Sequence, residues 1–122
     1  MTTTMPPKLL LKRGDIVLAL FPHSNLRTAK TRPALVVQAD NLQTGVPQLI
    51  DAMITSKMSR IPHPSRVAVI RSTPTGQRSG LLMDSLVMSD NLATVAEVAV
   101  ERVIGRLPMD GIDTALRYTL AL

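Results

Sequence analysis

Arg32 and Thr55 are the two side chains whose type and position suggest contact with a phosphate group. Arg32 stands directly before Pro33, at the start of the apolar run ALVV. A guanidinium presents a planar fork of N–H donors that fits phosphate oxygens, and it stays charged at physiological pH. Thr55 closes a second apolar run, LIDAMIT, and Ser56 and Lys57 follow it. Cations and hydroxyls at the mouths of two strands predict a site for an anion.

A hairpin between these two apolar runs would bring the two side chains together. PALVVQA and QLIDAMITS have the composition of strands, and the segment DNLQTGVP between them is rich in turn-forming residues. Pairing Ala39 with Gln48 and counting outward places Arg32 opposite Thr55. Opposite residues of antiparallel strands share one face, with Cβ atoms about 4.5–5.5 Å apart. Because a slip of one residue would separate them, the phosphate site depends on this register.

The rest of the chain reads as short strands with one terminal helix. The tail carries Ile112, Ala115, Leu116 and Thr119 at helical spacing, and Pro108 stands just before it. PHSNLRTAKTR and KMSRIPHPS read as basic loops, RSTPTGQRSG as a turn and AEVAV as a short helical turn. This order predicts a small antiparallel barrel with a helix packed on it. Four further segments are predicted strands: GDIVLALF, RVAVI, SLVMSDNLATV and RVIGRL.

Length and composition limit the class of protein. The 122 residues, 45% of them hydrophobic, predict one domain over 1–122, with residues 1–12 as a loose lead-in. Cysteine is absent, which excludes disulfides, thiolate metal sites and a cysteine nucleophile and fits a reducing cytoplasm. No apolar run approaches the roughly 18 residues of a membrane span. Two histidines and scattered aspartates form no recognisable ligand set, so we expect no metal and no cofactor.

The positive charge is concentrated in the first two thirds of the chain. The net charge is +5, and neither residues 16–39 nor residues 52–83 contain an Asp or Glu. This distribution predicts a polyanionic partner, although charge alone leaves open a merely soluble basic protein. The only aromatic residues are Phe21 and Tyr118. A bound nucleic acid would therefore be held mainly by phosphate contacts and hydrogen bonds rather than by stacking on aromatic rings.

Five motifs occur in an order that resembles a known family. RGDIVLALFP, KTRPALVV, ITSK, DSLVMSDNLATV and IGRLP follow one another as in the MazF/PemK toxins of bacterial type II toxin–antitoxin systems. The resemblance runs from about Lys12 to the C-terminus. It implies an SH3-like barrel with appended helices, acting as a homodimer. It also implies a metal-independent, sequence-specific endoribonuclease for single-stranded RNA, mainly messenger RNA, and an antitoxin whose acidic flexible tail occupies the RNA groove.

The same resemblance assigns roles to individual residues. It implies Arg32 and Thr55 as the catalytic pair of a reaction in which the 2′-hydroxyl attacks the neighbouring phosphorus. The products are a 2′,3′-cyclic phosphate and a 5′-hydroxyl. We expect Arg32 to stabilise charge on the phosphate, with donation to the leaving group as a second role, and Thr55 to hold a nonbridging oxygen or orient the 2′-hydroxyl. RNA contacts are expected from Lys30, Arg27, Ser56, Lys57, Arg60 and His23.

The sequence departs from the family at two places. SNLRTAK stands where the better-known members carry a Glu-Gln-Gly-Gly type of sequence, and Ala93 stands where they carry an arginine. We therefore assign no acidic catalytic residue and carry no RNA contact over to position 93. The proton acceptor and the cleaved RNA sequence stay unassigned.

The sequence leaves open two other functions and one other site for RNA cleavage. The related CcdB-like toxins inhibit DNA gyrase by binding, and a family member without activity would serve as an RNA-binding regulator. An intact Arg32 and Thr55 pair favours cleavage over both. A two-histidine ribonuclease site is the third possibility, because histidine titrates near neutral pH. His23 and His63 would have to form it, and both lie beside prolines in loops.

Overall fold

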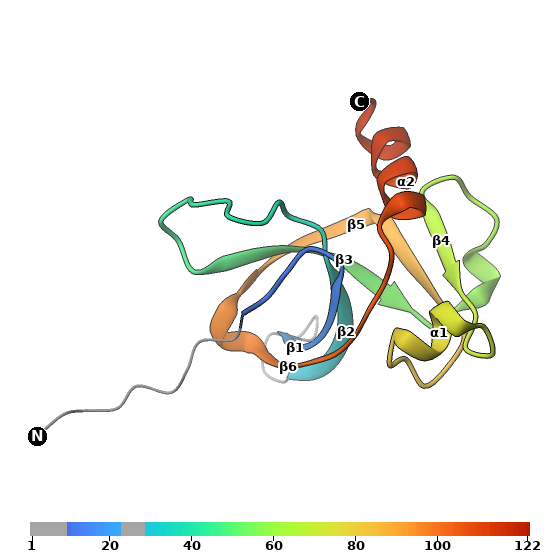
Figure 1. Ribbon diagram of the computed structural model, residues 1–122, viewed down its shortest axis with the longest axis horizontal. Helices are drawn as coiled ribbons and strands as arrows, with labels where there is room; N and C mark the ends of the chain where they lie inside the picture. The colour runs from blue at the N-terminus through green and yellow to red at the C-terminus, as the bar shows by residue number, and fades with distance from the viewer. Residues whose placement is uncertain (1–9, 23–28) are drawn as a thin grey trace, which may run out of the picture.

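The structure is a computed structural model that describes residues 10–22 and 29–122. In these residues six strands form one antiparallel sheet in the order β4-β5-β3-β2-β1-β6 (Figure 1). The strands are β1 (Asp15–Pro22), β2 (Ala29–Val36), β3 (Gln48–Thr55), β4 (Arg66–Val69), β5 (Ser85–Ala96) and β6 (Val100–Arg106). The helices are the short η1 (Met58–Arg60), α1 (Pro74–Arg78) and η2 (Glu97–Ala99) and the longer α2 (Asp110–Leu120).

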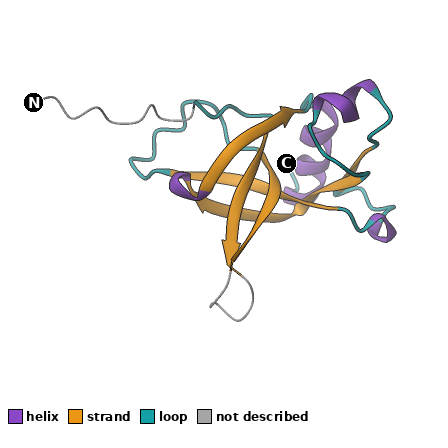
Figure 2. Ribbon diagram, turned by 90° about the horizontal axis from the view of Figure 1, so that it is seen from below, coloured by secondary structure: helices purple, strands orange, loops and turns teal. Residues whose placement is uncertain are grey.

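The sheet curls strongly but stays open. Figure 2 shows the strands curving around one another, with the helix α2 at one end of the sheet. The edge strands β4 and β6 do not pair with each other in the described part of the chain. The mainly β fold with a C-terminal helix is therefore confirmed, and the sheet resembles a barrel without closing into one. No helix among the described residues is long and apolar enough to cross a membrane.

Buried side chains lie on both faces of the sheet. Because side chains alternate along a strand, neighbouring residues of β1 and β2 enter different clusters. The helix α2 contacts β4 and β5 and contributes Ile112 to the first cluster. That cluster includes Ile16, Leu35, Ala52, Ile54 and Val87. The second cluster, on the other face, includes Val17, Ala34, Val36, Leu49 and Val95.

Asp51 is the one ionisable side chain of the central strand β3. It is fully buried and lies opposite Val36 of β2 and Ala93 of β5. Neither of its carboxylate oxygens has a hydrogen-bond partner among the described residues. Burial raises the pKa of Asp51 to about 7, because the apolar surroundings disfavour its charged form.

Most predicted elements are confirmed, two are wrong, and the predicted loop KMSRIPHPS contains the single helical turn η1. The strands at GDIVLALF, QLIDAMITS, RVAVI, SLVMSDNLATV and RVIGRL, the turn at AEVAV and the terminal helix all appear, with boundaries shifted by at most two residues. The predicted start of β2 at Pro33 is wrong, because Ala29–Arg32 extend the strand by pairing with β1. The segment predicted as a turn contains α1, which Thr73 caps by accepting a hydrogen bond from the Gly76 N–H at 3.0 Å.

Candidate active site

A cleft of about 510 Å³ opens between β2 and β3. Residues 30–33 of β2 line one side, and residues 53–57 of β3 and the following turn line the other. The remaining wall comes from β1, β5, β6, Arg60 of η1 and the segment between α1 and β5. Its lining residues are Leu18, Arg60, Gly80, Leu81, Leu82, Met83, Ser85, Met88, Asn91, Arg102 and Ile104.

The register between β2 and β3 agrees with the predicted one. Ala34 pairs with Met53, Leu35 with Ala52 and Val36 with Asp51. Continuing this register by two residues places Arg32 opposite Thr55, on the face that also carries Ala34 and Met53. The pairing itself stops at Ala34–Met53. Arg32 and Thr55 therefore face each other across the cleft rather than as close neighbours within a continuous ladder.

The hydroxyl of Thr55 is held by the turn that follows it. Thr55 Oγ1 accepts a hydrogen bond from the Lys57 N–H at 3.2 Å. A hydroxyl has one hydrogen to donate and two lone pairs, so the Thr55 hydrogen remains available for an acceptor in the cleft. The same bond fixes the backbone of Lys57, whose side chain also lines the cleft. The Thr55 hydroxyl, as a hydrogen-bond donor, and the cation Lys57 therefore lie together at one end of β3.

The cleft is strongly cationic. Lys30, Arg32, Lys57, Arg60 and Arg102 line it, and no Asp or Glu does so among the described residues. A concave surface that carries charges of one sign concentrates the field and attracts ions of the other sign. Six of the eight residues predicted for the site are therefore together in the cleft: Lys30, Arg32, Thr55, Ser56, Lys57 and Arg60. The other two, His23 and Arg27, lie outside the described residues.

Two hydrogen bonds of Arg66, one of them part of an ion pair, fix the wall formed by η1. Arg66 Nη1 donates to the Arg60 carbonyl at 2.6 Å, and Arg66 Nη2 donates to Asp90 Oδ2 at 3.0 Å. The Arg66 hydrogen bond lowers the pKa of Asp90, so this carboxyl stays charged to lower pH than usual. Arg60 Nη1 also approaches Met88 Sδ at 3.5 Å. The backbone of Arg60 is therefore held beside the cleft by a charge on β5.

The sequence prediction missed Arg102, which lies on β6. It pairs across the sheet with Leu18 of β1, and Leu18 in turn pairs with Pro33 of β2. The Thr31 hydroxyl donates to Glu101 Oε1 at 3.2 Å, which ties the start of β2 to the same part of β6. Nothing in the spacing of the sequence marks Arg102, because its partner strand lies about eighty residues earlier.

Two exposed apolar side chains stand at the rim of the cleft. Leu82 is 83% exposed and Met83 is 60% exposed, although both belong to a well-anchored turn. Buried Ser79 accepts from the Leu81 N–H at 3.1 Å, and the Ser85 hydroxyl donates to the Met83 carbonyl at 2.8 Å. A rigid turn that holds apolar groups in solvent provides a surface on which a ligand can pack.

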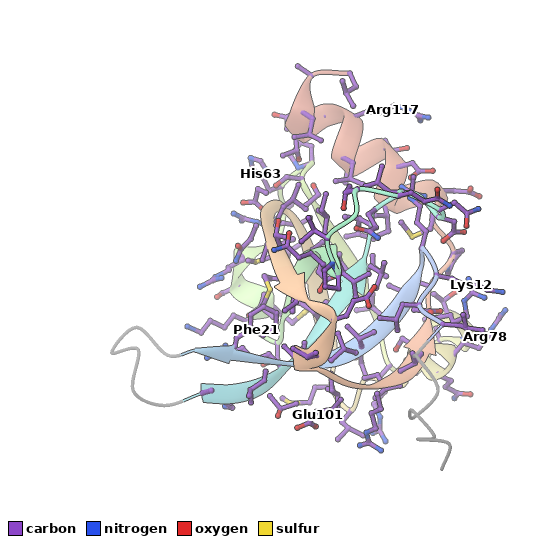
Figure 3. All side chains as sticks on the ribbon, turned by 90° about the vertical axis from the view of Figure 1, so that its left-hand side faces the viewer. Lys12, Phe21, His63, Arg78, Glu101 and Arg117 are labelled. Atoms are coloured by element: carbon purple, nitrogen blue, oxygen red, sulfur yellow. The ribbon has the colours of Figure 1, made fainter. Side chains whose placement is uncertain are left out.

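His63 lies away from this site. Its Nδ1 is 2.6 Å from the Ser65 hydroxyl, and its ring makes an edge contact with Tyr118 of α2, with ring centroids 6.0 Å apart. Figure 3 shows His63 beside α2, at the opposite end of the view from Glu101 of β6. His63 does not line the cleft. Within the described residues, no group of three or more His, Cys, Asp or Glu side chains has the arrangement of a metal site.

Comparison with known proteins gives one family match. Residues 12–120 match the profile of a family described as PemK-like, MazF-like toxin of type II toxin-antitoxin system. No curated protein matches the sequence at a significant level.

Solved structures of several toxins have a similar fold. A mycobacterial endoribonuclease in complex with its cognate antitoxin superposes with a TM-score of 0.69 at 21% identity, covering 92% of this chain and 96% of that chain. For the Mycobacterium tuberculosis toxin MazF-mt6 the TM-score is 0.68 at 22% identity, covering 88% and 97%. For MazF from Deinococcus radiodurans it is 0.68 at 17% identity, covering 93% and 99%. At these identities the likeness establishes the fold.

Proposed function

The chain belongs to the PemK-like, MazF-like family of type II toxins, and we propose from this premise that it is an endoribonuclease with its active site in the cleft between β2 and β3. One observation carries the proposal. Among the residues that the structure describes, five cationic residues and no carboxylate line a cleft across which Arg32 and Thr55 face each other. This arrangement fits the phosphate backbone of a single-stranded RNA.

The proposed reaction is an internal transfer of the phosphoryl group. The 2′-oxygen bonds to the adjacent phosphorus while the bond from phosphorus to the 5′-oxygen breaks. The 2′-hydroxyl loses its proton to solvent and the departing 5′-oxygen gains one from solvent, which leaves a 2′,3′-cyclic phosphate and a 5′-hydroxyl. Arg32 stabilises the extra negative charge on the phosphoryl oxygens, and Thr55 donates its hydroxyl hydrogen to one of them. Because Arg32 remains protonated, we assign it no role as a base.

The side chains of the cleft bear on which group accepts the 2′-hydroxyl proton and on whether a metal ion takes part. None of the described lining residues has a carboxylate or an imidazole, so none offers the usual proton acceptor or the usual ligands for a divalent metal. In our proposal the 2′-hydroxyl proton therefore passes to solvent, and the reaction proceeds without a metal ion. Lys30, Ser56, Lys57, Arg60 and Arg102 hold the flanking phosphates, while bases pack on Leu82 and Met83.

The first experiment measures cleavage of a long single-stranded RNA in excess EDTA. We expect discrete cuts whose 5′-hydroxyl ends accept a phosphate from a polynucleotide kinase without prior treatment. Arg32→Ala should lower kcat/KM roughly 100- to 1,000-fold, the usual effect of removing a donor to a developing oxyanion. Thr55→Val should also lower kcat/KM, because valine has nearly the shape of threonine but no hydroxyl.

The matched control is Arg78→Ala. Arg78 is an exposed arginine of α1 that does not line the cleft, so this variant should cleave like the wild type. Cleavage that survives in Arg32→Ala would contradict the assignment of the site. A folded wild-type protein that cuts none of several RNAs would contradict the nuclease proposal and favour an RNA-binding or gyrase-binding protein.

We propose an antitoxin partner and a dimeric state on the basis of family membership. One similar structure contains an endoribonuclease with its cognate antitoxin. In this chain the cationic cleft would attract an acidic, flexible antitoxin tail and so block access by RNA. Such a segment should inhibit cleavage competitively, and sedimentation should give twice the mass of the 13.2 kDa chain. A toxin that acts on messenger RNA and is blocked by an antitoxin would work in the cytoplasm, which is the location we propose.

A further inference from the structure

The hydrogen-bonded pairing of β2 with β3 ends before either strand ends. Their pairing stops at Ala34–Met53, although β2 continues back to Ala29 and β3 continues to Thr55. Over these same residues β2 remains paired with β1, and β3 remains paired with β5. The loss of pairing is therefore specific to the β2–β3 ladder and is not fraying of the strands.

Pro33 stands at the point where this ladder stops. The Val37 N–H donates to the Ile50 carbonyl at 3.0 Å, which shows that odd-numbered residues of β2 direct their backbone groups toward β3. Direction alternates along a strand, so position 33 also faces β3, where the register places it opposite Ile54.

Proline lacks the N–H that the next rung of the ladder requires. A regular ladder would continue with a bond from the N–H of residue 33 to the Ile54 carbonyl, and proline cannot make it. The bond from the N–H of residue 33 to the Ile54 carbonyl would also be one of the two hydrogen bonds on either side of the Arg32–Thr55 pair. Each of the two pairs beyond Ala34–Met53 thus lacks one of its two hydrogen bonds, because both would use the N–H of residue 33.

We propose that Pro33 is a positioning residue that keeps the active-site cleft open. By ending the β2–β3 ladder it holds Arg32 and Thr55 on opposite sides of the cleft, and it leaves the Ile54 carbonyl oxygen free to accept a hydrogen bond from the bound RNA. Pro33 and Ile54 both line the cleft, so the two positions concerned are at the site itself. The inference rests on the proposed function, since it explains how substrate enters between these two strands.

The Pro33→Ala variant restores the missing donor. We expect its new amide at position 33 to bond to the Ile54 carbonyl and to exchange slowly with deuterium, like the interior amides of β3. The added rung should narrow the cleft, so kcat/KM for a mapped RNA site should fall roughly 10- to 100-fold. The melting temperature should stay within about 5 °C of the wild type. An equally stable but less active enzyme is not what a purely structural proline would give.

A second variant separates the missing donor from the proline ring. Lactic acid at position 33, introduced as a backbone ester, has neither an N–H nor a ring. It should keep cleavage near the wild-type rate, because the ladder still cannot close. Pro108→Ala is the matched proline control, since Pro108 is exposed and does not line the cleft, and it should leave cleavage unchanged.

The outcomes distinguish this inference from the function on which it rests. A wild type that cleaves RNA, with Pro33→Ala cleaving equally well, would overturn the inference and leave the nuclease function intact. A rapidly exchanging amide at position 33, or a lactic acid variant as impaired as Pro33→Ala, would overturn it as well. A wild type that cuts no RNA would refute the function, whereas amide exchange would still test whether Pro33 interrupts the ladder.

Discussion

Asp51 is a buried carboxyl that the site does not use, and it links folding stability to pH. The pKa of Asp51 is raised from 3.8 to about 7 by burial, and neither oxygen has a partner among the described residues. Between these two values the folded state binds a proton that the unfolded state does not. The free energy of unfolding should therefore fall as pH rises from about 4 to about 7 and level off above that range.

Asp51→Asn tests this linkage, because it removes the titration and nearly preserves the shape. We expect the variant to be more stable than the wild type at pH 8 by about 2–4 kcal/mol, and the difference to shrink toward zero near pH 4. Urea unfolding at several pH values gives both numbers.

The difference in unfolding free energy between the two proteins at each pH reports Asp51 alone. It cancels the contribution of groups that stabilise the fold as pH rises, such as Asp90, whose pKa is lowered. The exposed Asp110 provides a control: Asp110→Asn should not reproduce the gain in stability at pH 8. An equal slope in the wild type and in Asp51→Asn would show that Asp51 is hydrated or paired in solution.

At the scale of elements, η1 depends on the ion pair that connects β4 to β5. Arg66 holds the Arg60 carbonyl and is itself held by Asp90. Asp90→Asn removes the charge that orients Arg66, so Lys57 and Arg60 should lose part of their fixed position. Exposed ion pairs contribute little, so we expect KM for RNA to rise about two- to fivefold with kcat nearly unchanged.

Steady-state kinetics on one RNA site separates the two constants. Asp113→Asn breaks the ion pair with Arg13, which lies outside the cleft, and should leave KM unchanged. If kcat falls while KM stays constant in Asp90→Asn, then η1 contributes to the chemical step and not to binding.

The sequence predicts some strands and helices better than others, depending on how local their signals are. The β2–β3 register followed from the positions of Gln48 and Ala39 around one turn, because local pairing leaves few alternatives. The sequence does not predict Ala29–Arg32 as strand, because Lys30, Thr31 and Arg32 are polar and lack the apolar pattern that marks buried strands. The helix α1 has five residues, too few for a helical period, although Thr73 and Pro74 carry a start signal.

The site was predicted where its residues are close in sequence and missed where they are not. Ser56 and Lys57 follow Thr55 directly, so the hairpin carried them into the cleft. Arg102 reaches the cleft only through the pairing of β6 with β1, which no local pattern specifies. The early end of the β2–β3 ladder was missed too, because it depends on which strand the Pro33 nitrogen faces.

At the scale of the whole molecule, the cleft brings together cations from β2, η1, β6 and the turn after β3. Binding of an uncleavable 2′-deoxy oligonucleotide should weaken steeply with salt. If three to five phosphates are neutralised, the slope of log K against log salt should be about −2 to −3.5. Arg102→Ala should make the slope less steep by about 0.7.

The Arg78→Ala variant serves again as the control, because it removes the same charge from outside the cleft. Its slope should equal that of the wild type. A slope unaffected by Arg102→Ala would place Arg102 outside the RNA path. Fluorescence anisotropy at several salt concentrations measures all three proteins.

The pairing of β6 with β1 also affects when the toxin becomes active during its synthesis. Arg32 and Thr55 leave the ribosome early, whereas Val100–Arg106 are made near the end of translation. Until β6 is made, β1 is an unpaired edge strand of the sheet. Until then the cleft lacks Arg102 and the wall that β6 provides. We expect a nascent chain to spare the message from which it is being read, and a chain truncated before Val100 to leave RNA intact in a cell-free translation reaction.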